Sequence, residues 1–393
     1  MKKPLVFFKK IIDRSKWLFF GYIFKFFNIN NNKVVVDNFF GKGYGGNPKY
    51  IVEKMLVENP NVDVIWLINN TVDKTLFPSQ VKLVKFNSIR SIFELSTAHI
   101  WIDNVKNNYK GKKRKGQFYI QTWHGGIGFK KVEKESIETL SKEYIKESKY
   151  DSKQIDLMIS NSRWVSKNYR DNFWYNGKIL ETGLPRNDIF FMNSNNIKNK
   201  VKKFFRVNGD IVLYAPTFRN YLSIDSQVEL FKINGEKIVE ELYKKFGKKY
   251  TLIVRAHPNI AKDFNLKENQ FLKNGSDYPD MQELLVASDV LITDFSSSVF
   301  DFMLKSSRIF LFAKDYRDYI ENEREMKINP QKDLPFSFAT SEKKLLNDIN
   351  NFNQKEMDRK VEMFNNKMGI KDDGKSSQRV ANLLNKELKG SNV

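Results

Sequence analysis

The feature that most constrains the fold is a series of short apolar runs that end in polar residues. Three of them are residues 119–124 (Tyr-Ile-Gln-Thr-Trp-His), 252–257 (Leu-Ile-Val-Arg-Ala-His) and 290–298 (Val-Leu-Ile-Thr-Asp-Phe-Ser-Ser-Ser). Runs of this kind predict strands buried on both faces, as in parallel sheets covered by helices. Ligands bind at the carboxyl ends of such strands, so the polar residues there are candidates for a functional site.

Strands and helices alternate along the whole chain, which predicts an α/β fold. At 393 residues the chain is too long for one ordinary core. We therefore expect two doubly wound Rossmann-type domains that face each other, an N-terminal one over 33–200 and a C-terminal one over 201–393. The expected strands include 33–37, 63–68, 81–86, 100–103, 155–160, 210–215, 250–256, 290–293 and 308–312, and the expected helices include 47–58, 88–97, 234–246, 280–287 and 297–304.

Residues 1–32 form a segment of different composition, rich in Phe, Ile, Leu and Lys. Its longest uncharged run, residues 17–24, is far short of the ~20 apolar residues that a spanning helix needs. No continuous apolar region leads to a small-residue cleavage site, so we do not expect a signal peptide. The composition favours an amphipathic helix on an anionic membrane surface. The alternative is a helix packed against the protein itself.

The formal net charge of +21 attracts polyanions or anionic lipid, although a lysine-rich composition that only aids solubility would give the same charge. No nucleic-acid recognition motif is visible, so nucleic acid is not the expected partner. The chain has no cysteine, which excludes disulfides and thiolate metal sites and fits a reducing cytoplasm. The histidines lack paired metal-ligand spacing, and we predict neither a metal nor a cofactor.

Two of the three histidines, His124 and His257, lie where a predicted strand meets a loop. Histidine is the side chain best suited to move a proton near neutral pH. Gly125 and Gly126 follow His124 and would let a ligand approach the backbone closely. The alternative for each histidine is a structural hydrogen bond. His99 has no such context, and we interpret it as structural.

Hydroxyl and cationic side chains at the other strand ends suit phosphate. Ser296, Ser297 and Ser298 follow a strand at the expected start of a helix, where free N–H groups bind anions well. Arg255 and His257 form a cation pair that suits phosphate or pyrophosphate. The alternative for the serines is an N-cap without a ligand. Together these motifs indicate an enzyme that acts on a phosphate group.

Four motifs also occur in the order seen in one known family. They are Trp123-His124-Gly125 and the stretches 214–219 (Tyr-Ala-Pro-Thr-Phe-Arg), 255–258 (Arg-Ala-His-Pro) and 293–297 (Thr-Asp-Phe-Ser-Ser). With them, the chain from about 33 to 312 resembles the CDP-glycerol glycerophosphotransferase family, which builds teichoic acids and related polyol-phosphate polymers. Residues 39–42 with Asn47 and Pro48 also look like the first strand and loop of that family. Residues 126–130 differ from the family's Thr-Pro-Leu-Lys type run.

The resemblance implies a GT-B-like pair of domains around a central cleft. It also implies transfer of glycerol phosphate from CDP-glycerol, or another CDP-polyol, to a hydroxyl of a lipid-linked saccharide, with release of CMP. The expected location is the cytoplasmic face of a bacterial plasma membrane, bound peripherally. The alternatives are a GT-B glycosyltransferase that uses a nucleotide-sugar and a polyanion-binding protein.

The resemblance assigns a role to each candidate residue. His124 would be the base, and His257 would bind or stabilise the donor phosphates. Ser296, Ser297 and the helix start would hold the pyrophosphate. The full set is catalytic His124 and His257; donor-binding Thr217, Arg219, Arg255, Thr293, Asp294, Ser296, Ser297 and Ser298; and acceptor-side Trp123, Gly125 and Gly126.

Overall fold

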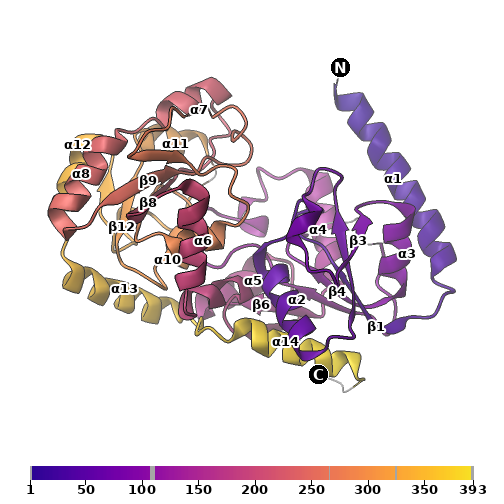
Figure 1. The fold of residues 1–393 in the computed structure, drawn as a ribbon. Coiled ribbons are helices and arrows are strands. Elements are labelled where there is room, and N and C mark those ends of the chain that lie inside the picture. The colour runs from indigo at the N-terminus through magenta and orange to yellow at the C-terminus, as the bar shows by residue number, and fades with distance from the viewer. Residues whose placement is uncertain (1, 107–110, 265, 324, 391–393) are drawn as a thin grey trace. The chain divides into compact units, whose positions relative to one another are not determined.

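The computed structural model describes residues 2–106, 111–264, 266–323 and 325–390, with the side chains of the first helix described from Ile12 onward. It divides into two compact units. Unit 1 is made of Met1–Gly126, Glu133–Asp188 and Lys371–Val393. Unit 2 is made of Ile127–Val132 and Ile189–Ile370. Figure 1 shows that each unit is a sheet covered by helices.

The sheet of unit 1 has seven parallel strands in the order β3-β2-β1-β4-β5-β6-β7. The central strands are apolar and buried on both faces, as the sequence predicts for a doubly wound sheet. The elements of unit 1 are α1 (Lys2–Phe24), β1 (Asn30–Val36), α2 (Gly46–Glu58), β2 (Asp63–Ile68), η1 (Lys74–Leu76), β3 (Lys82–Lys85), α3 (Ile89–Thr97), β4 (Ala98–Asp103), β5 (Phe118–Gln121), η2 (Glu133–Ser136), α4 (Lys142–Ser152), β6 (Leu157–Ser160), α5 (Arg163–Asn172), β7 (Lys178–Glu181) and α14 (Ser376–Leu388), with η3 (Pro185–Phe191) at its end.

The sheet of unit 2 has six parallel strands in the order β10-β9-β8-β11-β12-β13. Its core lies between the sheet and the helices α8 and α12 on one face. The elements of unit 2 are α6 (Asn195–Phe205), β8 (Asp210–Ala215), α7 (Ile224–Leu230), α8 (Gly235–Phe246), β9 (Tyr250–Val254), β10 (Leu272–Asn274), α9 (Met281–Ala287), β11 (Val290–Thr293), α10 (Ser298–Phe302), β12 (Ile309–Phe312), α11 (Tyr316–Asn322), β13 (Phe338–Ala339), α12 (Glu342–Asn350) and α13 (Gln354–Met368).

The α/β class, the doubly wound order of both sheets and the N-terminal helix confirm the predicted fold class. Some predicted elements are wrong in length. The strand expected over 250–256 is β9, which ends at Val254, and the helix expected over 297–304 is α10, which covers only Ser298–Phe302. After Phe302 the backbone tightens into i→i+3 hydrogen bonds, from Leu304 N to Asp301 O and from Lys305 N to Phe302 O. The α-helix therefore ends two residues earlier than expected.

The compact units are not continuous in sequence, and their boundaries differ from the expected division at 200–201. α14 packs on the sheet of unit 1 through Val380, Ala381 and Leu384, all of which are fully buried. In the other direction, residues 127–132 belong to unit 2. Lys130 forms an antiparallel bridge with Met326 and an ion pair with Glu323 at 3.0 Å.

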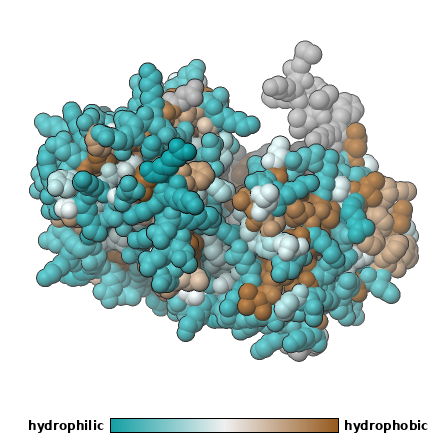
Figure 2. Space-filling view, viewed as in Figure 1, coloured by the Kyte–Doolittle hydropathy of each residue, from teal (hydrophilic) through white to brown (hydrophobic). Residues whose placement is uncertain are grey.

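The helix α1 has two different faces. On its inner face Trp17 is 8% exposed, and the ring of Phe24 lies 5.3 Å from the ring of Phe93 in α3. The contacts of this inner face agree with the alternative interpretation of residues 1–32, a helix that packs against the protein itself. The outer face leaves large apolar side chains in solvent, and in Figure 2 brown atoms gather where α1 and α3 lie. The exposed apolar side chains of α1 are Ile12, Leu18, Phe19, Tyr22 and Ile23, and Phe26 is exposed just after the helix.

No helix in the described part of the chain is long and apolar enough to cross a membrane.

Candidate functional site

Both sheets reverse their strand order at a point where ligands commonly bind in doubly wound folds. In unit 1 the reversal lies between β1 and β4, and in unit 2 between β8 and β11. The loops that follow these strands and their neighbours β5 and β9 carry most of the candidate residues, whereas Thr293 is the last residue of β11 and Ser298 is the first residue of α10. The motifs therefore form one cluster at the carboxyl edge of each sheet.

His124 follows β5 and is held by the loop after the neighbouring strand β4. Its Nδ1 lies 3.0 Å from the carbonyl oxygen of Asn104. The side chain of Asn104 is itself fixed, because its Oδ1 accepts from Phe39 N at 2.9 Å and its Nδ2 donates to Asn38 Oδ1 at 2.6 Å. The ring of Phe39 also packs on the imidazole, with centroids 5.3 Å apart.

This contact fixes the protonation pattern of the imidazole. A carbonyl oxygen only accepts hydrogen bonds, so Nδ1 of His124 carries the proton and Nε2 keeps its lone pair. Burial lowers the pKa of His124 to about 4; the bond to Asn104 and the charge of Glu133 oppose this shift, whereas Arg186 adds to it. At neutral pH the ring is therefore uncharged with Nε2 as the acceptor, which is the state that a general base needs.

The neighbours of His124 have different roles. The Trp123 ring lies beside the imidazole, tilted by 36° with centroids 4.1 Å apart, and meets the Phe173 ring edge-to-face at 4.9 Å. A Cβ on Gly125 would meet nothing within 4 Å, so space for a ligand exists there. A Cβ on Gly126 would lie 2.6 Å from Asn161 Oδ1, so this glycine accommodates the packing of Asn161.

In unit 2, Asp294 joins the loops after β8 and β11. Its carboxylate accepts from Thr217 N at 2.9 Å and Thr217 Oγ1 at 2.6 Å, and pairs with Arg219 Nη1 at 2.8 Å. Thr293 Oγ1 ties the same loops by donating to Ala215 O at 2.6 Å. Asp294 and Arg219 are both 1% exposed. They therefore hold the two loops together from beneath, rather than presenting charges to solvent.

Arg219 also makes a two-pronged ion pair with Asp315, which follows β12. Nε and Nη2 of Arg219 donate to the two carboxylate oxygens at 2.7 and 2.9 Å. Burial alone would raise the pKa of Asp315, but the hydrogen bonds and charge of Arg219 hold it below its ordinary value. Tyr221 adds a third donor at 2.6 Å. The buried guanidinium thus connects the ends of three neighbouring strands, β8, β11 and β12.

The serine run lies directly after Asp294. Ser298 Oγ donates to Ser296 Oγ at 2.9 Å, and Ser297 begins α10 without a side-chain cap. Ser297 occupies the N-cap position of α10, and Ser296 Oγ accepts from the backbone N–H of Ser298 at 3.3 Å, so the N-cap alternative for the serines is present in part. Ser296 and Ser297 are half-buried.

Arg255 and His257 follow β9 and point to different partners. Arg255 Nη1 donates to the backbone carbonyls of Tyr278 at 2.5 Å and Gly275 at 3.3 Å, and burial lowers the Arg255 pKa. His257 is exposed, and its Nδ1 accepts from Asn259 N at 3.2 Å. Its Nε2 therefore carries the proton when the ring is neutral. His257 is a donor where His124 is an acceptor.

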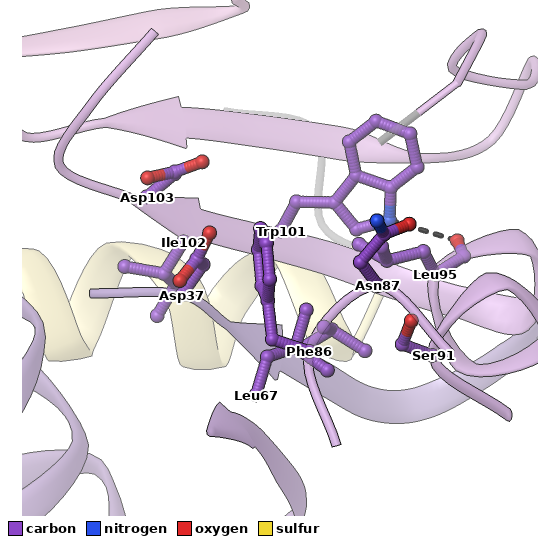
Figure 3. A pocket seen from close by; sticks show the side chains of 10 residues that line it. Asp37, Leu67, Phe86, Asn87, Ser91, Leu95, Trp101, Ile102 and Asp103 are labelled. Carbon is purple, nitrogen blue, oxygen red and sulfur yellow. Dashed lines mark hydrogen bonds between the residues drawn. The ribbon is translucent and has the colours of Figure 1, made fainter. Parts of the chain in front are cut away.

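The enclosed cavity drawn in Figure 3 is not a substrate site. It lies in unit 1 beside the ends of β1 and β4, with Asp37 and Asp103 at its wall and Trp101 bonded to Leu95 O. Its volume of about 10 Å³ leaves room for no more than one water molecule. Within the described residues, no three His, Asp or Glu side chains come together as a metal site.

Several residues of the site were not predicted from the sequence. Asn104 contacts the imidazole of His124, and Asp315 pairs with Arg219. Asn47 and Arg186 contact the backbone around His124. Asn47 lies in a stretch that resembles the family, but no role follows from that stretch. The contacts that Asn47, Arg186 and Asn104 make with the His124 loop go to main-chain carbonyls or from a main-chain carbonyl to the imidazole, so they leave no pattern of residue types.

Residues 18–386 match the CDP-Glycerol:Poly(glycerophosphate) glycerophosphotransferase family. The chain belongs to this family. It is 31% identical over 377 residues to a teichoic acid poly(glycerol phosphate) polymerase of Staphylococcus epidermidis, with 92% of this chain and 52% of that protein covered. It thus spans about half the length of that relative.

Two further relatives match over nearly their whole length. A teichoic acid glycerol-phosphate transferase of Staphylococcus aureus is 27% identical over 388 residues, covering 96% of this chain and 98% of that protein. A solved structure of a variant of the wall teichoic acid polymerase TagF, soaked with CDPG, matches with a TM-score of 0.81 and 27% identity. That match covers 99% of this chain and 98% of the other. The predicted family is confirmed.

Proposed function

We propose that this protein transfers glycerol phosphate, or a related polyol phosphate, from a CDP-polyol to a hydroxyl of a membrane lipid-linked acceptor, releasing CMP. Its family and the names of its relatives support glycerophosphate transfer in teichoic acid synthesis. The observation that carries the proposal is the neutral His124, with Nε2 as acceptor at the carboxyl edge of the unit 1 sheet.

The reaction needs one proton to be removed. The acceptor hydroxyl gives its proton to Nε2 of His124, and its oxygen attacks the phosphorus that bears glycerol. The bond from that phosphorus to the bridging oxygen breaks, and the electron pair leaves with CMP. Catalysis of phosphoryl transfer rests mainly on positioning and on stabilising the charge of the phosphate oxygens.

The loops at the edge of the unit 2 sheet suit the donor. Ser296 and Ser297 offer hydroxyl donors to the pyrophosphate, Ser298 orients Ser296 by donating to its Oγ, and His257 offers Nε2–H to a phosphate oxygen. Four other candidates do not face the donor but fix the shape of the loops through buried contacts. They are Thr217, Arg219, Thr293 and Asp294. Arg255 adds positive charge beside them, although its Nη1 already donates to backbone carbonyls.

The outer face of α1 supports binding to an anionic membrane surface. Large apolar side chains stand out from a helix that also carries exposed Arg14 and is followed directly by exposed Lys25. Aromatic and basic residues together are typical of helices that lie in the headgroup layer. The inner face of α1 packs on α3, so the helix would join the enzyme to the bilayer without leaving its own unit.

The test is a transfer assay with CDP-[14C]glycerol and a lipid-linked disaccharide, run beside CDP-ribitol and UDP-sugars. We expect label in the lipid product, release of CMP, and a fall of about 10²–10⁴ in rate for His124→Ala. His99→Ala is the matched control, because His99 is a half-buried histidine of the same unit with no role in the proposal. Transfer from UDP-sugars alone would replace the proposal with a glycosyltransferase. A folded His124→Ala variant with normal turnover would remove His124 as the base.

A further inference from the structure

The loop that carries His124 is held in an unusual conformation. Trp123 has a φ of +53°, a left-handed backbone that costs free energy for a bulky residue. Such a conformation persists only where the surroundings impose it. Two of the side chains that impose it come from distant parts of unit 1, namely Asn47 and Arg186.

Asn47 bonds to the loop on its strand side. It is fully buried at the start of α2, and its Nδ2 donates to Trp123 O at 3.1 Å and to Thr122 O at 3.3 Å. Its Oδ1 accepts from Arg186 N at 3.2 Å. The single amide therefore joins α2, the His124 loop and the loop after β7.

Arg186 forms a hydrogen bond with the backbone of His124, the residue after Trp123. Its Nη1 donates to His124 O at 2.6 Å, a charge-assisted hydrogen bond. Gln121 completes the arrangement, because its Oε1 accepts from Trp123 N at 2.9 Å. The carbonyls of Thr122, Trp123 and His124 are thus all bonded to side chains, and the imidazole has little freedom to turn.

We propose that Asn47 and Arg186 are positioning residues, which fix the backbone of Trp123 and His124 so that Nε2 of His124 faces the acceptor hydroxyl. Neither residue needs to touch the substrate for this role. The inference rests on the proposed function, since it assumes that His124 is the base.

The charge of Arg186 gives the proposal a second readout. The charged groups that act on His124 are Arg186, which lowers its pKa, and Glu133, which raises it. Glu133 is itself paired with Lys106 at 3.2 Å. Removing the Arg186 charge should therefore raise the His124 pKa, and keeping the charge with lysine should not.

The experiment compares Asn47→Asp, Arg186→Gln and Arg186→Lys in the full chain. Asn47→Asp keeps the shape of the side chain but replaces its donor with a carboxylate oxygen facing two carbonyls. For Asn47→Asp and Arg186→Gln we expect kcat to fall by about 10–10²-fold, the range that a small misplacement of a catalytic group produces. KM for CDP-glycerol should stay within about two-fold, because donor binding is not affected.

Histidine ¹⁵N NMR supplies the other measurement, since only three histidines need assignment. Arg186→Gln should raise the His124 pKa, while Arg186→Lys should leave it near the wild-type value and recover part of kcat. Arg379→Gln is the control: Arg379 clamps the same loop through Thr182, at 2.6 and 2.8 Å, but does not touch His124. It should keep both kcat and the His124 pKa.

Normal kcat in folded Arg186→Gln and Asn47→Asp would overturn the inference. An equal loss in Arg379→Gln would overturn it too, because general loosening of the loop would then explain the effect. These failures are separate from failure of the base assignment, which only an active His124→Ala would show.

Discussion

Arg219→Met tests whether the buried ion network of unit 2 supports its fold as the geometry indicates. The substitution places an apolar side chain of similar length there and removes every hydrogen bond that Arg219 donates to Asp315 and Asp294, leaving Asp315 with the bond from Tyr221. Asp294 retains bonds from Thr217 and from Phe295 N, whereas Asp315 loses its two-pronged partner. Removing one partner of a buried ion pair costs about 3–5 kcal/mol, because a charge remains buried without compensation.

The expected change in melting temperature follows from the size of the unit. For a unit of 150–250 residues, 1 kcal/mol shifts Tm by about 2–4 °C, so the unit 2 transition should fall by roughly 6–20 °C at pH 7. Differential scanning calorimetry would measure it. Lys344→Met is the control in the same unit, since Lys344 pairs with Asp348 on the surface and is 50% exposed. Such surface pairs contribute about 0–1 kcal/mol.

The loss should also depend on pH. In the wild type the pKa of Asp315 lies below its ordinary value of 3.8, so its contribution is complete above that value and is lost as pH falls through the lowered pKa. In Arg219→Met, burial would instead raise the Asp315 pKa, and the carboxyl would take up a proton in mildly acidic solution. The difference between the two proteins should therefore shrink from pH 7 towards pH 4.5. If Arg219→Met and Lys344→Met have the same unit 2 melting temperature at pH 7, the ion network does not stabilise the unit.

Three further outcomes are expected. Because the His124 pKa is about 4, kcat/KM should show no acid limb from this residue between about pH 5 and 7, and a limb near pH 6.5 would contradict the neutral state of the half-buried imidazole. His257→Gln should raise KM for CDP-glycerol more than it lowers kcat, in steady-state kinetics; the reverse split would make His257 a proton carrier. Phe19→Ser with Phe26→Ser should weaken sedimentation with anionic liposomes and leave CDP-glycerol binding intact in calorimetry, whereas Val57→Ser, an equally exposed apolar site on α2, should change neither.

The strands and the order of motifs could be predicted from sequence because both are local. β5, β9 and β11 are mostly apolar and buried, and their carboxyl ends place His124, His257 and Asp294 as expected. Short edge strands such as β10 and β13 were not predicted, since two or three residues carry no periodic signal. The length of α10 was wrong because backbone geometry after Phe302, rather than propensity, ends the helix.

The support of the site was harder to predict, for a physical reason. Arg219 and Asp294 were predicted as donor-binding residues from their motif, and nothing in a motif tells an exposed charge from one buried in an ion network. Asn47 and Arg186 bond to carbonyl oxygens, which every residue possesses, so no complementary residue type marks their partners. Only the three-dimensional path of the chain reveals such contacts.

The return of α14 to unit 1 bears on the order of events during synthesis. Val380, Ala381 and Leu384 complete the core of the first sheet, and Asp188 anchors the same stretch through the backbone N–H groups of Ser376 and Ser377. Unit 1 therefore cannot close until these residues have left the ribosome, by which time all of Ile189–Ile370 has been made. Domains usually fold in the order of their synthesis. Here the nascent chain would complete unit 2 first, while the first sheet waits with an open apolar face that chaperones could bind.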